Sequence, residues 1–550
     1  MTRSRVPFLF IAYAVVAAVM AGPLINYSAL QSATYQGDAR LIVWTLAWDN
    51  HAVLSRLPLF DCNIFYPATH TLAYNEHLFG LSLFTLPLYA LTRNPVLAYN
   101  IVWWFSFPLN LLAMHALLRR HVHDDVAASA GALVYTFSFY KMLHAHGHLH
   151  LVWTWLLPLS LLLLERWVDR PTVARAALWA VAVILQLLTS WYVAVMTVVA
   201  HLVVFAWMGR AWIRQECVRR VWQLAIAGLL LAAILWPFAK PYWTLPAAPV
   251  NELAKGSADL AAYLVPPQNT WAGRLWLGHV GPSPRWIWGE NTLFVGWIAL
   301  GLGALGAVQL STLRRWSLLG AYLSLTLVAF ALSLGPSRAG TWTPFSVFAS
   351  LPAMGAFRAP ARFALLVLLG LSMLVAFGIQ FLQKRPGRAR FAVVALLPLM
   401  LAEWYVVGFP AGKPQPYPVP SIYLTAPVQT AHALVSLPDY RDARDWFQGA
   451  DYLYFSTAHW RPIVNGFGRA EPPEQAHVIS HMMAFPGPNN ARTMRQLGID
   501  YVVFHAARYP DGAAIAEMAR RMSEYELVVR IGTDYLFRVR PATGEGPLVP

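Results

Sequence analysis

The sequence predicts an all-α polytopic membrane bundle, with about eleven transmembrane helices and further interfacial or re-entrant helices, followed by a small α/β domain. Three observations lead to this fold class. Of the 550 residues, 57% are hydrophobic and only 12% are charged, so polar side chains are too few to cover a soluble protein of this length. Apolar runs that can cross a bilayer recur up to about residue 410. Charged residues become common only after a proline-rich segment, PQPYPVP, which predicts a second domain over 411–550.

The apolar runs are predicted to be helices, because a backbone in lipid must satisfy its own hydrogen bonds. The run at 78–95 is short and contains Gly80 and Pro87, so we predict a re-entrant or interfacial helix there, with a twelfth crossing as the alternative. The first run has a basic start and approaches the ~20 residues that span a bilayer, which favours an uncleaved helix over a signal peptide. The predicted crossings are 7–27, 96–118, 126–143, 149–165, 173–189, 191–209, 221–238, 291–311, 317–335, 363–382 and 391–408.

The net charge of +15 would suggest a nucleic-acid partner in a soluble protein. Here many Arg and Lys residues lie in short segments between apolar runs, which is typical of the positive-inside bias, so no nucleic acid is expected. Eleven crossings from a cytoplasmic N-terminus place every basic cluster in the cytoplasm and the C-terminal domain outside. We therefore predict an integral protein of the bacterial inner membrane, in contact with membrane lipids.

The tail predicts a compact α/β arrangement. ARTMRQLG predicts a helix that ends at glycine, and IDYVVFH predicts a buried strand. AAIAEMARRM predicts an amphipathic helix, and YELVVRI with DYLFRVR predicts two closing strands. Cys62 and Cys217 are expected on opposite faces of the membrane, so no disulfide is predicted.

The first outer loop, 28–77, carries acidic residues directly against the membrane. Asp38 follows Gly37 in GDAR, and LIVWTLAWDNHA continues as a predicted helix in the interface plane, with Trp44 and Trp48 on one face. Asp38 can be a general base that takes a proton from an acceptor hydroxyl, or the N-cap of that helix. Both interpretations fit its position.

Glu76 and His77 close the same loop. A carboxylate at a low-dielectric boundary is costly unless it is paired or solvated. The functional interpretation makes these residues a second acid or a ligand for substrate or metal. The alternative is an ion pair with a loop arginine or a surface charge.

The HAHGHLH run places four histidines, among them His146 and His148, in a short outer turn. Gly147 favours a turn over the regular spacing that a metal would need, and no carboxylate is near in sequence. Hydrogen bonding to substrate phosphate or sugar, metal binding and ordinary interfacial polarity all stay open. No metal ligands are assigned, although a divalent cation stays possible.

Arg358 and Arg362 in FRAPARF are spaced i, i+4 just before a membrane helix on the outer side. Cations there oppose the positive-inside bias, so something anionic is expected to hold them. Lipid headgroups and a polyprenyl phosphate are the two candidates. Glu290 is expected to anchor the start of the next helix through its dipole.

These features together resemble the GT-C superfamily of membrane glycosyltransferases, on GDARLIVWTLAW, IFYPATHTLAYNEH, HAHGHLHLVW and the α/β tail. The resemblance implies a polyprenyl-phosphate sugar as donor, an acceptor on the outer face, and Asp38 as catalytic base with Glu76 and His77 as partners. Arg358, Arg362, His146 and His148 are the predicted substrate-binding residues. No DxD-type metal pair is present in the first loop.

The alternative function is a transporter or flippase for a lipid-linked glycan. Such a protein should carry ionisable residues at mid-membrane depth, whereas the predicted crossings are nearly free of them at their centres. A non-catalytic assembly protein is a third possibility, and it would tolerate loss of Asp38.

Overall fold

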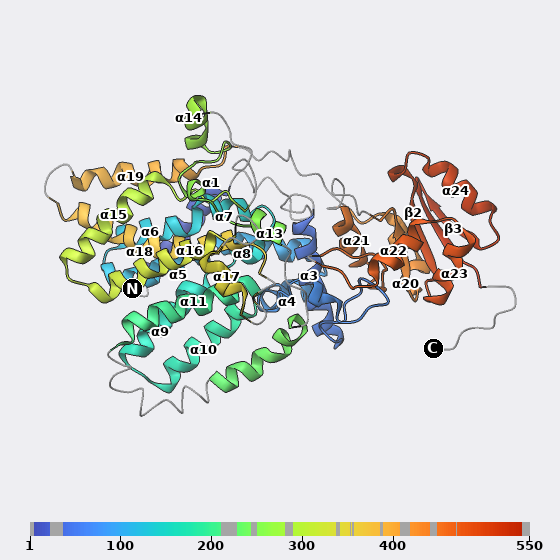
Figure 1. Ribbon diagram of the computed structural model, residues 1–550, viewed down its shortest axis with the longest axis horizontal. Coiled ribbons are helices and arrows are strands. Elements are labelled where there is room, and N and C mark those ends of the chain that lie inside the picture. Colours follow the sequence, from blue (N-terminus) through green and yellow to red (C-terminus); the bar gives the residue numbers. More distant parts are fainter. Residues whose placement is uncertain are drawn as a thin grey trace. The chain divides into compact units, whose positions relative to one another are not determined.

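The computed structural model describes residues 5–21, 37–210, 228–243, 250–280, 290–336, 342–351, 354, 357–385, 389–407, 418–439, 448–468 and 470–541. The chain is mostly helical, with a small sheet near its C-terminus (Figure 1). It divides into two compact units. The helical unit comprises Met1–Ser28, Leu78–Phe84 and Asn100–Lys413, and the α/β unit comprises Ala29–His77, Thr85–Tyr99 and Pro414–Pro550. The division at residue 410 predicted from composition stays a prediction.

Among the residues that the structure describes, five helices are long and apolar enough to cross a membrane, as expected of an integral membrane protein. They are Pro95–Val122, Leu149–Asp169, Trp191–Met208, Trp316–Ser333 and Pro360–Gln383. Shorter apolar helices occupy most of the other predicted crossings, at Pro7–Met20, Val173–Leu187, Gly228–Tyr242, Trp297–Thr312 and Phe391–Trp404. The number of crossings stays a prediction.

Two of the segments predicted from the sequence fold in ways that bear on whether they cross the membrane as single helices. The run at 78–95 forms α4 (Phe79–Thr92), whose 14 residues fall short of the ~20 that span a bilayer. The predicted crossing at 126–143 is instead two helices, α6 (Asp125–Phe137) and α7 (Phe139–His144). They part at Ser138, whose ψ of 152° is not helical, and serine is a poor residue for a helix interior.

The core of the helical unit is α18 (Ala364–Gln383), which is buried from Ala364 to Gln380. It packs mainly against α15 (Trp297–Thr312), α6 and α16 (Trp316–Ser333). The remaining labelled helices of this unit are α1 (Arg5–Met20), the C-terminal part of α5 (Pro95–Val122), α8 (Leu149–Val152), α9 (Leu156–Asp169), α10 (Val173–Leu187), α11 (Trp191–Met208), α13 (Val250–Lys255), α14 (Trp271–Val280), α17 (Pro344–Ala349) and α19 (Ala389–Trp404).

The α/β unit contains a four-stranded sheet with the order β1-β2-β4-β3. β1 (Leu434–Leu437) runs parallel to β2 (Tyr501–His505), whereas β4 (Asp534–Val539) is antiparallel to both β2 and β3 (Tyr525–Ile531). The predicted helices are present as α23 (Pro488–Gln496) and α24 (Gly512–Arg521), and Gly498 beyond α23 has a φ of 67°. Strands β2, β3 and β4 confirm the strand predictions, while β1 was not predicted.

The first loop forms part of the α/β unit through α3 (Asp38–Ser55). Trp44 and Trp48 lie in one hydrophobic core with Leu453 and Phe455 of α21 (Gly449–Ser456). The helix is therefore confirmed, but the face predicted for the membrane interface is covered by the chain itself. Burial against another apolar surface removes these rings from water more completely than an interfacial position would.

Candidate functional site

A buried cluster of charged and aromatic side chains surrounds Arg362 in the helical unit. We call Tyr140, His144, His148, Glu290 and Arg362 the Arg362 cluster. Arg362 lies in the short 3₁₀ helix Pro360–Phe363 that leads directly into α18, and it is only 5% exposed. Its Nε and Nη2 donate hydrogen bonds of 3.0 and 2.6 Å to Oε1 of Glu290. A cation in this position is therefore held by the protein's own carboxylate.

Aromatic side chains complete the surroundings of the guanidinium. The carbon at its centre lies 4.3 Å from the ring centroid of Tyr192, at the start of α11, which is a cation-π distance. The hydroxyl of Tyr140 donates to the backbone carbonyl of Arg362 at 3.3 Å. These contacts fix the position of Arg362 from two further helices.

The two arginines of FRAPARF have different surroundings. Arg358 keeps a third of its side chain exposed and lies 3.9 Å from Glu252, a long ion pair that solvent screens. The sequence predicts an anionic partner for Arg362 but does not identify it. In the structure this partner is Glu290. Arg358 is consequently the more accessible of the two cations.

His144 lies between Glu290 and His148. Its Nε2 is 3.6 Å from Oε2 of Glu290, and its Nδ1 is 3.4 Å from Nδ1 of His148. If the Nε2 proton of His144 points to the carboxylate, its Nδ1 accepts from Nδ1–H of His148, which leaves Nε2 of His148 as the acceptor. This assignment of tautomers follows from the distances and the carboxylate charge.

Glu290, His144 and His148 interact in series. The carboxylate of Glu290 orients the imidazole of His144, and that imidazole orients the imidazole of His148. Burial raises the cost of charge on Glu290, but Arg362 and His144 outweigh it and lower the pKa of Glu290 to about 2. Burial lowers the pKa of His144 well below its usual range, although Glu290 acts in the opposite direction. Glu290 is therefore ionised and His144 neutral at neutral pH.

The turn predicted in HAHGHLH is present between α7 and α8. His148 is partly exposed in it, and its ring centroid is 5.8 Å from that of buried His150. Burial, with a smaller contribution from His148, lowers the pKa of His146 to about 4. A neutral His146 can donate or accept a hydrogen bond but does not bring positive charge to a phosphate.

The predicted role of Glu290 as the anchor of the next helix was wrong. It lies in a turn seven residues before α15, and its carboxylate faces Arg362 and His144 instead. The sequence separates Glu290 from Arg362 by 72 positions, and no local pattern signals such a pair. The one available hint was an arginine on the side of the membrane where cations are rare.

The first-loop candidates belong to the α/β unit. Asp38 is the first residue of α3 and is partly exposed, while Gly37 takes the N-cap position with a φ of 90°. Asp38 is therefore inside the first turn, where a carboxylate also favours the helix dipole. His77 is 4% exposed, and burial lowers its pKa to about 4, so it is neutral at neutral pH. Glu76 precedes it and is partly buried.

Within the described ranges, no group of three or more His, Cys, Asp or Glu residues is arranged to hold a metal ion. Asp38, Glu76 and His77 lie in the α/β unit, whereas His146, His148, Arg358 and Arg362 lie in the helical unit. Their joint role in one site stays a prediction, as does any need for a divalent cation.

The sequence profile of DUF6311, a domain of unknown function, matches residues 9–453. No curated protein matches the sequence. Among solved structures, the chain is similar to the arabinofuranosyltransferase AftD from Mycobacteria, with a TM-score of 0.57 and 14% identity over 98% of this chain and 40% of that one.

Two further structures are similar. The oligosaccharyltransferase of Archaeoglobus fulgidus in its apo form has a TM-score of 0.51 and 12% identity, over 92% of this chain and 70% of that one. ArnT from Cupriavidus metallidurans, bound to undecaprenyl phosphate, has a TM-score of 0.48 and 12% identity over 98% of both chains. On the two matches with TM-scores above 0.5, the fold of this chain resembles that of GT-C membrane glycosyltransferases, which confirms the resemblance predicted from the sequence.

Proposed function

The chain belongs to the DUF6311 family, and we propose that it is an inverting glycosyltransferase that moves a sugar from a polyprenyl-phosphate carrier to an acceptor on the outer face of the membrane. The observation that carries this proposal is the fold. Two proteins with TM-scores above 0.5 are named as an arabinofuranosyltransferase and an oligosaccharyltransferase, and the similarity extends over at least 92% of this chain. Fold alone does not define chemistry, so the proposal depends on the residues below.

The proposed reaction is a single displacement. The Asp38 carboxylate takes the proton of the acceptor hydroxyl as its oxygen attacks the anomeric carbon. The bond from that carbon to the carrier phosphate breaks, and its electron pair stays on the phosphate oxygen. Direct attack from the opposite face inverts the anomeric centre. Gly37 takes the N-cap position of α3 and Asp38 lies in its first turn, so the alternative of Asp38 as the N-cap residue does not apply.

Glu76 and His77 are proposed as partners of Asp38. A neutral His77 fits a hydrogen-bonding role better than a charge-stabilising one, because burial lowers its pKa to about 4. Glu76 would then be the second carboxylate that orients the acceptor. Neither role requires a bound nucleotide, in keeping with a donor that is already activated by its phosphate.

The departing phosphate needs positive charge and hydrogen-bond donors. Arg358 is proposed as the direct contact, since its side chain is one-third exposed and its pair with Glu252 is long. Glu290 anchors Arg362, so Arg362 is proposed to stabilise the departing phosphate with a positive charge at a fixed position. His146 is proposed to donate a hydrogen bond from the adjoining turn. His148, whose Nδ1–H donates to His144, is proposed to accept a hydrogen bond at Nε2 from a hydroxyl of the donor sugar.

The test is transfer of labelled sugar from a set of polyprenyl-phosphate sugars by the purified full-length protein in proteoliposomes. Asp38→Asn should lower transfer by about 100-fold or more, the range of general-base catalysis. The matched control is Asp61→Asn in the same loop. Asp61 is exposed, and its Oδ1 accepts from the backbone N–H of His70 and lies 3.8 Å from Nδ1 of the same residue. Wild-type transfer by Asp38→Asn would remove the base assignment. Movement of lipid-linked sugar across the bilayer without transfer would favour the transporter alternative.

A further inference from the structure

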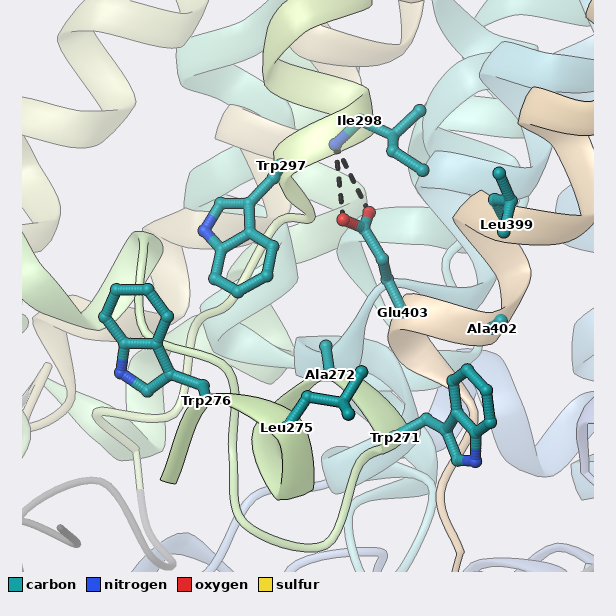
Figure 2. Close-up of a pocket in the computed structure, with 9 residues that line it drawn as sticks. All are labelled: Trp271, Ala272, Leu275, Trp276, Trp297, Ile298, Leu399, Ala402 and Glu403. Atoms are coloured by element: carbon teal, nitrogen blue, oxygen red, sulfur yellow. Dashed lines mark hydrogen bonds between the residues drawn. The ribbon is translucent and has the colours of Figure 1, made fainter. Parts of the chain in front are cut away.

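An apolar pocket lies in the helical unit, on helices that carry no member of the Arg362 cluster. It has a volume of about 420 Å³ and is lined by residues of α14, α15 and α19 (Figure 2). Three tryptophans contribute to it: Trp271 and Trp276 from α14, and Trp297 from the first position of α15. The ring centroids of Trp276 and Trp297 are 5.4 Å apart. Among the described residues that line it, Glu403 of α19 is the ionisable side chain.

The carboxylate of Glu403 has weak partners inside the protein. Figure 2 shows it reaching toward the backbone nitrogen of Ile298, with Trp297 and Trp276 on one side and Trp271 on the other. Its two oxygens accept from Ile298 N at 3.4 and 3.3 Å, which are long for hydrogen bonds. Across the described residues, no lysine or arginine lies within ion-pair distance of it. A carboxylate in apolar surroundings is costly unless a cation accompanies it.

We propose that this pocket binds the ammonium headgroup of a zwitterionic membrane phospholipid. Tryptophan faces attract ammonium groups through their ring quadrupoles, and a carboxylate among them adds direct charge attraction. The same carboxylate repels phosphate, so an anionic headgroup is disfavoured. A sugar is a poorer occupant. The described lining residues offer one charged acceptor, and the Trp297 Nε1 already donates to the carbonyl of Leu264 at 2.9 Å.

The rim of the pocket favours a lipid over a free cation. Leu275 is 66% exposed, Leu399 is 52% exposed and Trp271 is 58% exposed, which is a large apolar surface for a protein to leave in water. The volume also exceeds that of an ammonium group, so part of it must hold apolar atoms next to the charge. Tryptophans at such a rim are typical of the headgroup level of a bilayer. This inference does not depend on the proposed transferase activity.

The experiment titrates the full-length protein in detergent with phosphatidylethanolamine or with phosphatidylglycerol of the same acyl chains, and measures retained lipid by native mass spectrometry. Wild type should retain one phosphatidylethanolamine with about tenfold preference, the range of a desolvated cation–aromatic contact. Glu403→Gln keeps an oxygen for Ile298 but removes the charge, so the preference should disappear. If wild type retained the two lipids equally, the proposal would be overturned, because the pocket would then recognise the shared acyl chains and not the headgroup.

Two further variants separate charge recognition from misfolding. Trp276→Leu should weaken the preference and Trp276→Phe should restore part of it, because only the aromatic ring attracts the ammonium. Glu517→Gln, an exposed residue of α24 paired with Arg520 and Arg521, removes one negative charge elsewhere and should leave the preference unchanged. Unaltered preference in both Glu403→Gln and Trp276→Leu would also overturn the proposal.

Discussion

Arg362 donates from both Nε and Nη2 to one oxygen of Glu290, 72 positions away in the sequence. The second oxygen of Glu290 is the one that faces His144, at 3.6 Å. One carboxylate therefore divides its two oxygens between a fixed cation and an imidazole. The same carboxylate therefore stabilises the helical unit through Arg362 and, through His144, orients the partly exposed His148.

Glu290→Gln should destabilise the protein strongly. The substitution leaves the guanidinium of Arg362 buried without a counter-charge, which costs about 3 kcal/mol in buried pairs. The thermal unfolding midpoint in detergent should fall by several degrees. Arg358→Gln is the control, since its pair with Glu252 is long and partly exposed and should contribute little. Equal midpoints for wild type and Glu290→Gln would contradict a structural role for the pair.

The Glu290 contribution should depend on pH only in acid. Its folded pKa is lowered from 4.5 to about 2, so the stabilisation is complete above pH 4.5 and is lost as pH falls toward 2. The difference in unfolding midpoint between wild type and Glu290→Gln should be constant from pH 5 to 8 and shrink below pH 4.5. A difference that varies near pH 6.5 would instead point to histidine titration.

His148→Gln should weaken binding of the lipid-linked donor more than it slows the chemical step. On the proposed function, His148 accepts a hydrogen bond from a hydroxyl of the donor sugar, so its loss raises KM more than it lowers kcat. His144→Phe should change the ¹⁵N signals of His148, because Nδ1 of His148 loses the partner that fixes its tautomer. His481→Gln, on the exposed side of the α/β unit, is the control and should alter neither quantity.

Asp451→Ala should destabilise the α/β unit. Asp451 of α21 is 2% exposed and forms an ion pair with Arg40 of α3, while Nη2 of Arg508 lies 3.7 Å from its other oxygen. Its removal takes away the carboxylate that pairs with buried Arg40, at a cost of about 3 kcal/mol. Limited proteolysis should then cleave the tail faster than in wild type. Glu517→Ala at an exposed helical pair serves for comparison and should change cleavage little.

The sequence predicts elements well where the signal is local. The apolar helices follow from apolar runs, and the amphipathic α24 and strands β2 to β4 follow from a periodicity within a short window. β1 has four residues, too few for such a pattern. The Arg362 cluster could not be predicted, because its members lie on α7, a turn and a 3₁₀ helix far apart in the chain. The packing of Trp44 and Trp48 was missed for the same reason, since their partners come from the tail.

Helices α15 and α18 are in close contact at Gly306. A Cβ on Gly306 would lie 1.8 Å from the carbonyl oxygen of Leu374, so the two backbones are too close for any side chain there. Gly306→Ala should therefore push the helices apart and cost about 1–3 kcal/mol, as overpacking of a core does. Gly301→Ala on the same helix is the matched control, because nothing lies within 4 Å of its Cβ position and alanine is the better helix former. Unfolding midpoints should separate the two variants clearly. Equal midpoints would mean that α15 and α18 do not approach this closely in the membrane.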